Sequence, residues 1–280
     1  MFNKKSDEFE YYELDKNSND ELEVFDDNLS SSKLGIGVFL GFAYIFFIPV
    51  IIFLILSIIY KSLGLEDSVE NLSTIAQFIS AVIVIVLMLI LMGSNLKKVL
   101  RDLVRDKTIG NAILFVIIIV AFNTMYSLIV SPYIQGTTAN QEEVNKMMIE
   151  MPLLAITFVV LVAPLVEELI FRYFTFNSLK LYVDPKWAIV ITTVAFAGIH
   201  LLQSIIMGTL VNDLILFPLY LIPSFLITYS YYKTKMFAVP ILIHMAYNGY
   251  QTAMFYLGQY LLEQLESSSS VVSSFIQLFR

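Results

Sequence analysis

Cysteine is absent from the 280-residue chain, and histidine occurs only twice. The lack of cysteine excludes disulfides, thiolate zinc sites, thiol nucleophiles and lipid anchors attached through cysteine. The sequence also lacks a glycine-rich nucleotide loop and a basic arm with interleaved aromatic residues. We therefore expect neither a nucleotide cofactor nor a nucleic-acid partner.

Apolar residues make up 58% of the sequence, whereas charged residues make up only 15%. Apolar runs of about 20 residues recur along the chain, which is the length that an α-helix needs to cross a bilayer. These runs are continuous, whereas the strands of a membrane barrel would alternate apolar and polar residues. The sequence therefore predicts an all-α polytopic membrane protein built as a helical bundle.

The distribution of polar residues predicts three regions. Residues 1–33 are acidic, and we expect a flexible cytoplasmic tail there. Residues 258–280 form a C-terminal tail in which a serine run is expected to end the last helix. The transmembrane domain occupies residues 34–257, with about seven spans at 34–60, 74–94, 109–131, 152–176, 187–207, 214–232 and 236–257.

Lysine and arginine predict the orientation, because short cytoplasmic loops are enriched in them. The segments on the opposite side of the membrane hold only Lys61, Lys146 and Arg280. We therefore predict a multi-pass protein of the cell membrane with its N-terminus in the cytoplasm and its C-terminus outside. The residues on the cytoplasmic side are Lys4, Lys5, Lys16, Lys33, Lys97, Lys98, Arg101, Arg105, Lys107, Lys180, Lys186, Lys233 and Lys235.

One apolar stretch contains two adjacent carboxylates and an arginine. Glu168 and Arg172 are four residues apart, so they share a helix face and can form an ion pair. Two adjacent carboxylates cannot both ionise cheaply in an apolar environment, so we expect Glu168 to stay charged and Glu167 to be free to accept a proton. An ion pair that only fixes helix packing is the alternative.

Each histidine lies in an apolar stretch with a notable residue four positions away. Phe196 and His200 share one helix face, and His244 and Asn248 share another. Histidine and asparagine can donate hydrogen bonds to a developing oxyanion, or they can simply join two helices. Ionisable groups inside a membrane are costly unless they face protein or water, so three such groups predict one shared intramembrane polar cavity.

The motifs EExxxR, FxxxH and HxxxN, in this order, resemble those of the CAAX-protease and bacteriocin-processing family, also known as the Abi family of intramembrane proteases. The resemblance covers about residues 110–257. It implies a glutamate-dependent endopeptidase with a cavity that opens to the cytoplasm. It also implies that Glu167 and His200 activate a water molecule, while His244 and Asn248 hold the oxyanion.

The resemblance implies supporting roles for the remaining motif residues. Glu168 and Arg172 would support the catalytic groups, and Phe196 would shape the wall of the substrate cavity. Tyr173 stands where the family often has glycine. This tyrosine would either narrow access to the substrate cavity or change helix packing.

Two other hydrolytic mechanisms are open. Glu167, His200 and His244 supply the donor types of a zinc site, but the sequence has no HExxH motif. We therefore favour an enzyme without a metal cofactor. Ser204 lies four residues after His200 and is a candidate nucleophile, although no GxSxG turn frames it.

Two readings other than an enzyme are also open. An ion-coupled transporter would use similar residues, and Pro218 and Pro223 interrupt one predicted span as in a discontinuous transporter helix. A membrane scaffold, an immunity protein or a partner of a sensor protein would need no catalysis at all. For the enzyme, the expected partners are membrane lipids and a substrate that is either a peptide or a lipidated protein.

Overall fold

The computed structural model describes residues 30–65, 69–134 and 136–278, and the regular elements within these ranges are all helical. The predicted acidic tail lies outside the described residues up to residue 29. The elements are α2 (Ser31–Phe46), α3 (Ile48–Ser62), α4 (Val69–Met92), α5 (Asn95–Asp102), α6 (Asp106–Val130), η1 (Ser131–Tyr133), α7 (Ala139–Glu150), α8 (Pro152–Thr157), η2 (Phe158–Val162), α9 (Ala163–Glu168), η3 (Leu169–Phe176), α10 (Asn177–Leu179), α11 (Pro185–Ile199), α12 (Leu202–Met207), α13 (Leu210–Leu216), α14 (Pro218–Thr234) and α15 (Ala238–Leu278).

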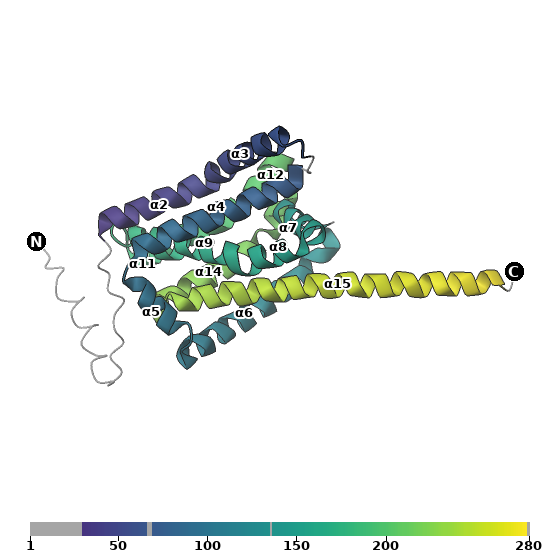
Figure 1. Cartoon of the computed structure of the whole chain (residues 1–280). Helices are drawn as coiled ribbons and strands as arrows, with labels where there is room; N and C mark the ends of the chain where they lie inside the picture. The colour runs from purple at the N-terminus through teal and green to yellow at the C-terminus, as the bar shows by residue number, and fades with distance from the viewer. Residues whose placement is uncertain (1–29, 66–68, 135, 279–280) are drawn as a thin grey trace, which may run out of the picture.

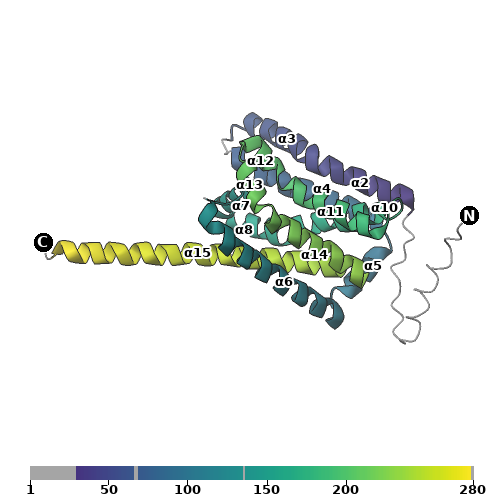
Figure 2. The same ribbon diagram turned by 180° about the vertical axis from the view of Figure 1, so that it is seen from behind.

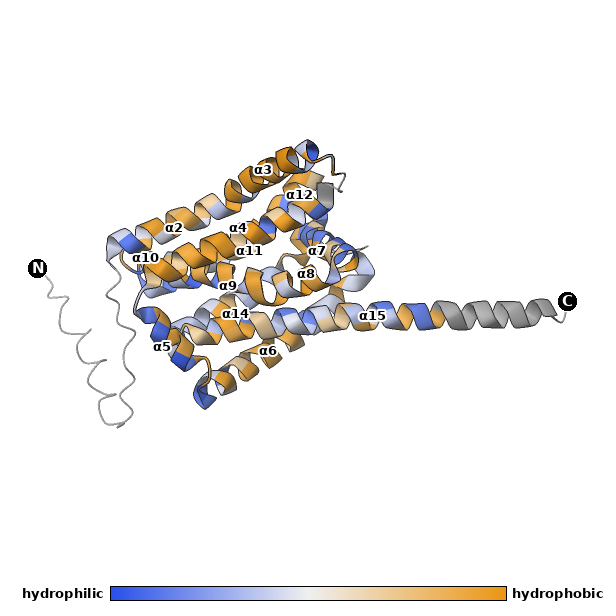
Figure 3. Cartoon of the chain, in the orientation of Figure 1, coloured by the Kyte–Doolittle hydropathy of each residue, from blue (hydrophilic) through white to orange (hydrophobic). Residues whose placement is uncertain are grey.

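The long helices pack side by side into one bundle, and α15 projects beyond it (Figures 1 and 2). The helices of the bundle consist mostly of apolar residues (Figure 3), and many of their large apolar side chains are exposed. Ile58, Ile90 and Leu128, for example, are 69%, 68% and 70% exposed. A soluble protein rarely exposes a continuous surface of this kind, whereas lipid tails would cover it in a membrane. The predicted all-α membrane bundle is confirmed.

Within the described parts of the chain, fewer helices than the seven predicted spans have the length and apolar composition to cross a membrane. Among the described residues, three helices are long and apolar enough to cross a membrane: Asn71–Met92, Asp106–Tyr133 and Pro152–Leu179. Two bent pairs, α2 with α3 and α13 with α14, raise the number to five if each pair is one span.

Two predicted elements differ in detail because of where the helices break. The predicted span 187–207 divides at His200, where α11 ends and the short helix α12 follows. The predicted end of the last helix at the serine run is wrong, because α15 continues to Leu278.

Helix α2 lies outside the resemblance but packs directly on η3. A Cβ atom added to Gly37 would lie 2.0 Å from Cδ1 of Phe174, and one added to Gly41 would lie 2.7 Å from Cγ2 of Ile170. Only glycine allows this close approach, as at many helix contacts in membranes. Because η3 carries Arg172, this contact holds the N-terminal helix against the element that supports the candidate site.

Candidate active site

The segment that carries the two glutamates is wound irregularly. Wider π-helical turns, η2 and η3, flank the six-residue helix α9. In η2 the amide of Ala163 donates to the carbonyl of Phe158, five residues earlier. Pro164 cannot continue this pattern because it has no N–H group. Asn248 of α15 compensates, since its Nδ2 donates to the carbonyl of Val159 at 2.9 Å.

Arg172 is fully buried behind the glutamates, and its guanidinium is held on several sides. Nη1 donates to Oε1 of Glu168 at 2.9 Å. Nε donates to the hydroxyl of Thr228 at 3.3 Å, and Nη2 lies 3.2 Å from both the carbonyl and the hydroxyl oxygen of Ser224. The Phe196 ring covers the guanidinium, with its centroid 4.2 Å from Cζ. This arrangement fixes the position of the Glu168 carboxylate.

His244 connects the two glutamates. Its Nδ1 lies 2.8 Å from Oε1 of Glu168, and its Nε2 lies 3.6 Å from Oε2 of Glu167. The shorter contact is a hydrogen bond in which Nδ1–H donates to the carboxylate, and it orients the ring so that Nε2 faces Glu167. The two carboxylates thus lie on either side of one imidazole ring.

His200 stands beside the same Phe196 ring. The centroid of the Phe196 ring lies 5.0 Å from that of His200 and 5.7 Å from that of His244. Nδ1 of His200 lies 2.9 Å from the carbonyl oxygen of Phe196, so this nitrogen carries the proton and Nε2 has a free lone pair. The Tyr220 ring stacks on His200 at 4.6 Å. The hydroxyl of Tyr220 is held by Thr138 at 2.6 Å and completes this wall.

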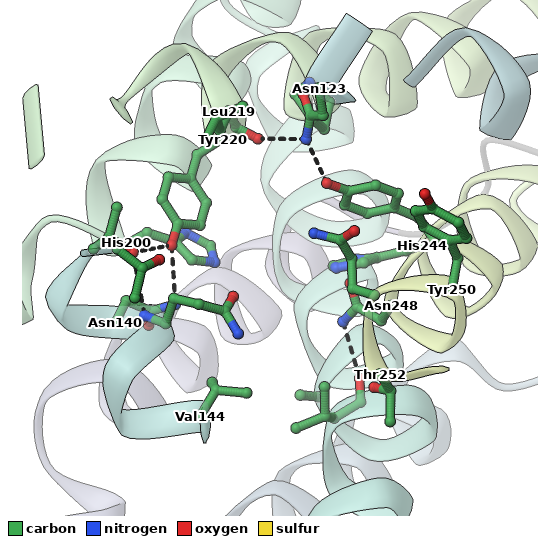
Figure 4. Close-up of a pocket in the computed structure, with 18 of the residues that line it drawn as sticks. Asn123, Asn140, Val144, His200, Leu219, Tyr220, His244, Asn248, Tyr250 and Thr252 are labelled. Atoms are coloured by element: carbon green, nitrogen blue, oxygen red, sulfur yellow. Dashed lines mark hydrogen bonds between the residues drawn. The ribbon is translucent and has the colours of Figure 1, made fainter. Parts of the chain in front are cut away.

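His200, His244 and Asn248 line one cavity of about 770 Å³ (Figure 4). The size is that of a typical ligand site. Glu168 and Arg172 do not line it and lie behind its wall. The motif residues that line it are Glu167, Phe196, His200, His244 and Asn248. The structure therefore brings all three motifs together, as the sequence predicts.

The placement of Tyr173 in the substrate cavity is wrong. Tyr173 is fully buried and is not among the residues that line the cavity. Its ring packs against Phe174 and Phe237, with centroids 5.0 and 5.1 Å away, and its hydroxyl accepts a hydrogen bond from Asn95 at 3.0 Å. A large residue at this position changes helix packing, because it fills the space between η3, α5 and the start of α15.

Ser204 is not placed to act as a nucleophile. Its side chain is fully buried, and its hydroxyl donates to Oδ2 of Asp213 at 2.5 Å. The same carboxylate accepts the backbone N–H of Ala139, at the start of α7, at 2.9 Å. Ser204 therefore helps to join α12, α13 and α7.

The cavity extends toward the end of the bundle that lies opposite the basic segments. It reaches α7, whereas α5 and the start of α6, which carry Lys97, Arg105 and Lys107, lie at the other end (Figure 1). The expected opening to the cytoplasm and the orientation predicted from the lysines and arginines therefore contradict each other. The helices that carry Glu167 and His244 continue past these residues toward the basic end.

Sequence reasoning missed the residues that support the motifs from other helices. Ser224 and Thr228 hold Arg172, and Tyr220 stacks on His200. One signal was available, since a buried arginine has five N–H donors that need acceptors, and Ser224 and Thr228 share a face of an apolar helix. Nothing in the local sequence of Tyr220 indicates its partner.

The histidines and acidic residues do not gather as metal ligands in the part of the chain that the structure describes. No group of three or more histidine, cysteine, aspartate or glutamate side chains there is arranged to hold a metal ion. The Nδ1 atoms of both histidines form hydrogen bonds with protein oxygens.

The structure combines an all-α membrane bundle with a polar cavity, and a buried Glu–Arg–His network lies at the floor of this cavity. Residues 149–250, which contain all three motifs, match the family described as type II CAAX prenyl endopeptidase Rce1-like. A curated relative, the membrane-embedded CAAX protease MroQ of Staphylococcus aureus (strain USA300), is 34% identical over 95 residues. This match covers 34% of the chain and 36% of the relative, about a third of each. No solved structure matches the chain.

This segment is thus similar to the CAAX-protease family, and the chain spans about a third of the length of the relative that it matches. The matched segment runs from the end of α7 to the middle of α15. Helices α2 to α6 precede it, and three of them, α2, α4 and α6, contribute further residues to the cavity wall, such as Tyr44, Gln77 and Asn123.

Proposed function

We propose that this protein is an intramembrane endopeptidase that hydrolyses peptide bonds with a water molecule activated by Glu167 and His200. The observation that carries the proposal is the continuous network Arg172–Glu168–His244–Glu167, which begins in the fully buried core and ends at the cavity. Such a network fixes the position and charge of catalytic groups before the substrate binds.

The geometry supports a direct attack by water. The carboxylate of Glu167 takes one proton from the water molecule, while Nε2 of His200 accepts a hydrogen bond from the other O–H. The water oxygen forms a bond to the carbonyl carbon of the substrate, and the carbonyl oxygen becomes an oxyanion. When the C–N bond breaks, the proton on Glu167 passes to the leaving amine, so that atoms and charges balance.

His244 and Asn248 are placed to stabilise the oxyanion. Nε2 of His244 faces Glu167 at the cavity, and it donates a hydrogen bond to the oxyanion when it carries a proton. Asn248 uses one N–H for the carbonyl of Val159 and keeps its second N–H. The Val159 contact fixes the amide, so the second donor needs no reorganisation during the reaction.

The proposed reaction uses no metal ion. In the described ranges the acidic and histidine side chains are not grouped as ligands, and both histidines are oriented by hydrogen bonds to their Nδ1 atoms. These contacts suit a base and an oxyanion donor that act through Nε2.

The experiment that tests the function is cleavage of a mixed library of quenched-fluorescent peptides by purified, detergent-solubilised protein. Glu167→Gln keeps the size of the side chain but removes the base, and we expect it to lower the cleavage rate by about 100-fold or more. Glu142→Gln is the matched control, because Glu142 is exposed and lies outside the cavity lining.

The outcomes separate the possible functions. Loss of cleavage in Glu167→Gln with full activity in Glu142→Gln supports the proposal. Equal rates in both variants would show that Glu167 is not the base. No cleavage by folded wild-type protein would move the assignment to a scaffold, immunity or transport role.

A further inference from the structure

We propose that the cavity receives its substrate from the extracytoplasmic face of the membrane, as a peptide or loop that has already been translocated. The inference rests on the proposed peptidase function and specifies where that enzyme meets its substrate. It departs from the cytoplasmic opening that the family resemblance implies.

The first support is the position of the cavity along each helix. On α6 the first lining residue, Val120, follows Arg105 by 15 residues, or about 22 Å of helix. On α14 the lining residue nearest the basic end, Ile227, precedes Lys233 by 6 residues, or about 9 Å of helix, and Leu219 precedes it by 14 residues, or about 21 Å. A bilayer core is about 30 Å thick, so on both helices the lining residues extend beyond its midplane, away from the basic end.

The other lining helices agree. Helix α11 begins next to Lys186 and reaches the cavity only through its last turn and the residue that follows, at Phe196 and His200. The segment from α8 to α10 lines the cavity between Phe158 and Glu167 and ends beside Lys180. In every case the basic residue marks the far end of the helix. The positive-inside rule therefore places the mouth of the cavity outside the cytoplasm.

The second support is the change in exposure along the cavity. His244 and Phe196, at its floor, are 6% and 5% exposed. Ser131 and Gln251, which line it farther along their helices from the basic end, are exposed. Access is therefore from the α7 end, because the opposite end is closed by packed helices.

The third support concerns the kind of peptide that the cavity accepts. The ionisable side chains among its described lining residues, apart from tyrosines, are Glu143, Glu167, His200 and His244, and no lysine or arginine lines it. Arg172 is hidden behind the wall and paired with Glu168. A cavity of this charge favours neutral or cationic peptide segments over a free C-terminal carboxylate.

The side on which the cavity opens can be measured by labelling single cysteines, because the chain has no cysteine of its own. Ser131→Cys places a thiol at the mouth, and Ser94→Cys is the matched control at the basic end. Both serines are exposed, and each lies next to the end of a helix. Intact cells are treated with a membrane-impermeant maleimide, and a parallel sample is permeabilised first so that both sites can react.

We expect Ser131→Cys to react in intact cells and Ser94→Cys to react only after permeabilisation. The reverse pattern would place the mouth in the cytoplasm and overturn the inference. Equal labelling of both sites in intact cells would also overturn it, because the two ends would not be separated by a membrane.

A second measurement connects the opening to catalysis. The quenched-fluorescent peptide library is added to sealed vesicles that contain wild-type protein, either right-side-out or inside-out. Cleavage confined to right-side-out vesicles supports the inference, and cleavage confined to inside-out vesicles contradicts it. If the detergent-solubilised protein does not cleave any peptide, the peptidase proposal fails, whereas the cysteine labelling still reports the side of the opening.

Discussion

Replacing Arg172 by methionine tests whether the buried network depends on one guanidinium. Methionine keeps most of the length of the side chain but removes the charge and every N–H donor. In the protein those donors contact Glu168, Thr228 and Ser224, and the Arg172 side chain is completely inaccessible to solvent. Oε2 of Glu168 already lacks a hydrogen-bond partner, so the carboxylate relies on its other oxygen.

The expected loss of stability is large. Removing one member of a buried ion pair leaves an uncompensated charge and typically costs about 3–5 kcal/mol. The second substitution, Glu168→Gln, removes that charge. The double variant Glu168→Gln/Arg172→Met should therefore be more stable than the sum of the two single effects predicts, by about 0.5–3 kcal/mol. Coupling of this sign would show that the charges interact directly.

The assay is reversible unfolding in mixed micelles, in which increasing SDS unfolds the helices and circular dichroism follows the loss of helix. Arg105→Met is the control, because Arg105 pairs with Asp102 at 3.0 Å but its side chain is 54% exposed. Asp102 is itself buried, but Arg101 lies 3.9 Å from the same carboxylate and stays beside it in this variant, so the loss of stability should be smaller than in Arg172→Met. If Arg172→Met costs no more than Arg105→Met, or if the double variant shows no coupling, the reasoning about the buried network is refuted.

Two further predictions concern packing and specificity. Gly37→Ala should destabilise the protein by about 1–3 kcal/mol, because the added Cβ would overlap the ring of Phe174. Gly35→Ala is the control and should have no such effect, because nothing lies within 4 Å of its added Cβ. Equal SDS unfolding midpoints for the two variants would contradict this prediction. Glu143→Gln should lower kcat/KM for lysine-containing peptides about two- to fivefold through loss of one ion pair. The same peptides measured with Glu142→Gln should show no change, and an equal effect in both variants would mean that Glu143 does not contact the substrate.

The sequence predicts the class of fold and the grouping of the motifs because both depend on local spacing. A continuous apolar run needs a helix, and residues four apart share a face, so Glu168 with Arg172 could be paired without a structure. The meeting of His244 with both glutamates follows only from the assumption that costly groups share one pocket. In the structure, Nδ1 of His244 lies 2.8 Å from Glu168 and Nε2 lies 3.6 Å from Glu167.

Other features depend on contacts between segments that are distant in the sequence, so local sequence patterns cannot predict these features. The contact of Tyr220 with His200 and the burial of Tyr173 away from the cavity are of this kind. The π-helical turns around α9 depend partly on Asn248, which accommodates the missing amide of Pro164 from another helix. The end of the bundle toward which the cavity extends can be predicted only if one knows which half of each helix lines it.

The most direct test of the central claim is the initial rate of peptide cleavage by purified wild-type protein, measured with and without a zinc chelator and beside Glu167→Gln of equal stability. A water activated by Glu167 predicts cleavage that is unchanged by the chelator and lost in Glu167→Gln. Cleavage that the chelator abolishes, or that Glu167→Gln retains, would contradict the account.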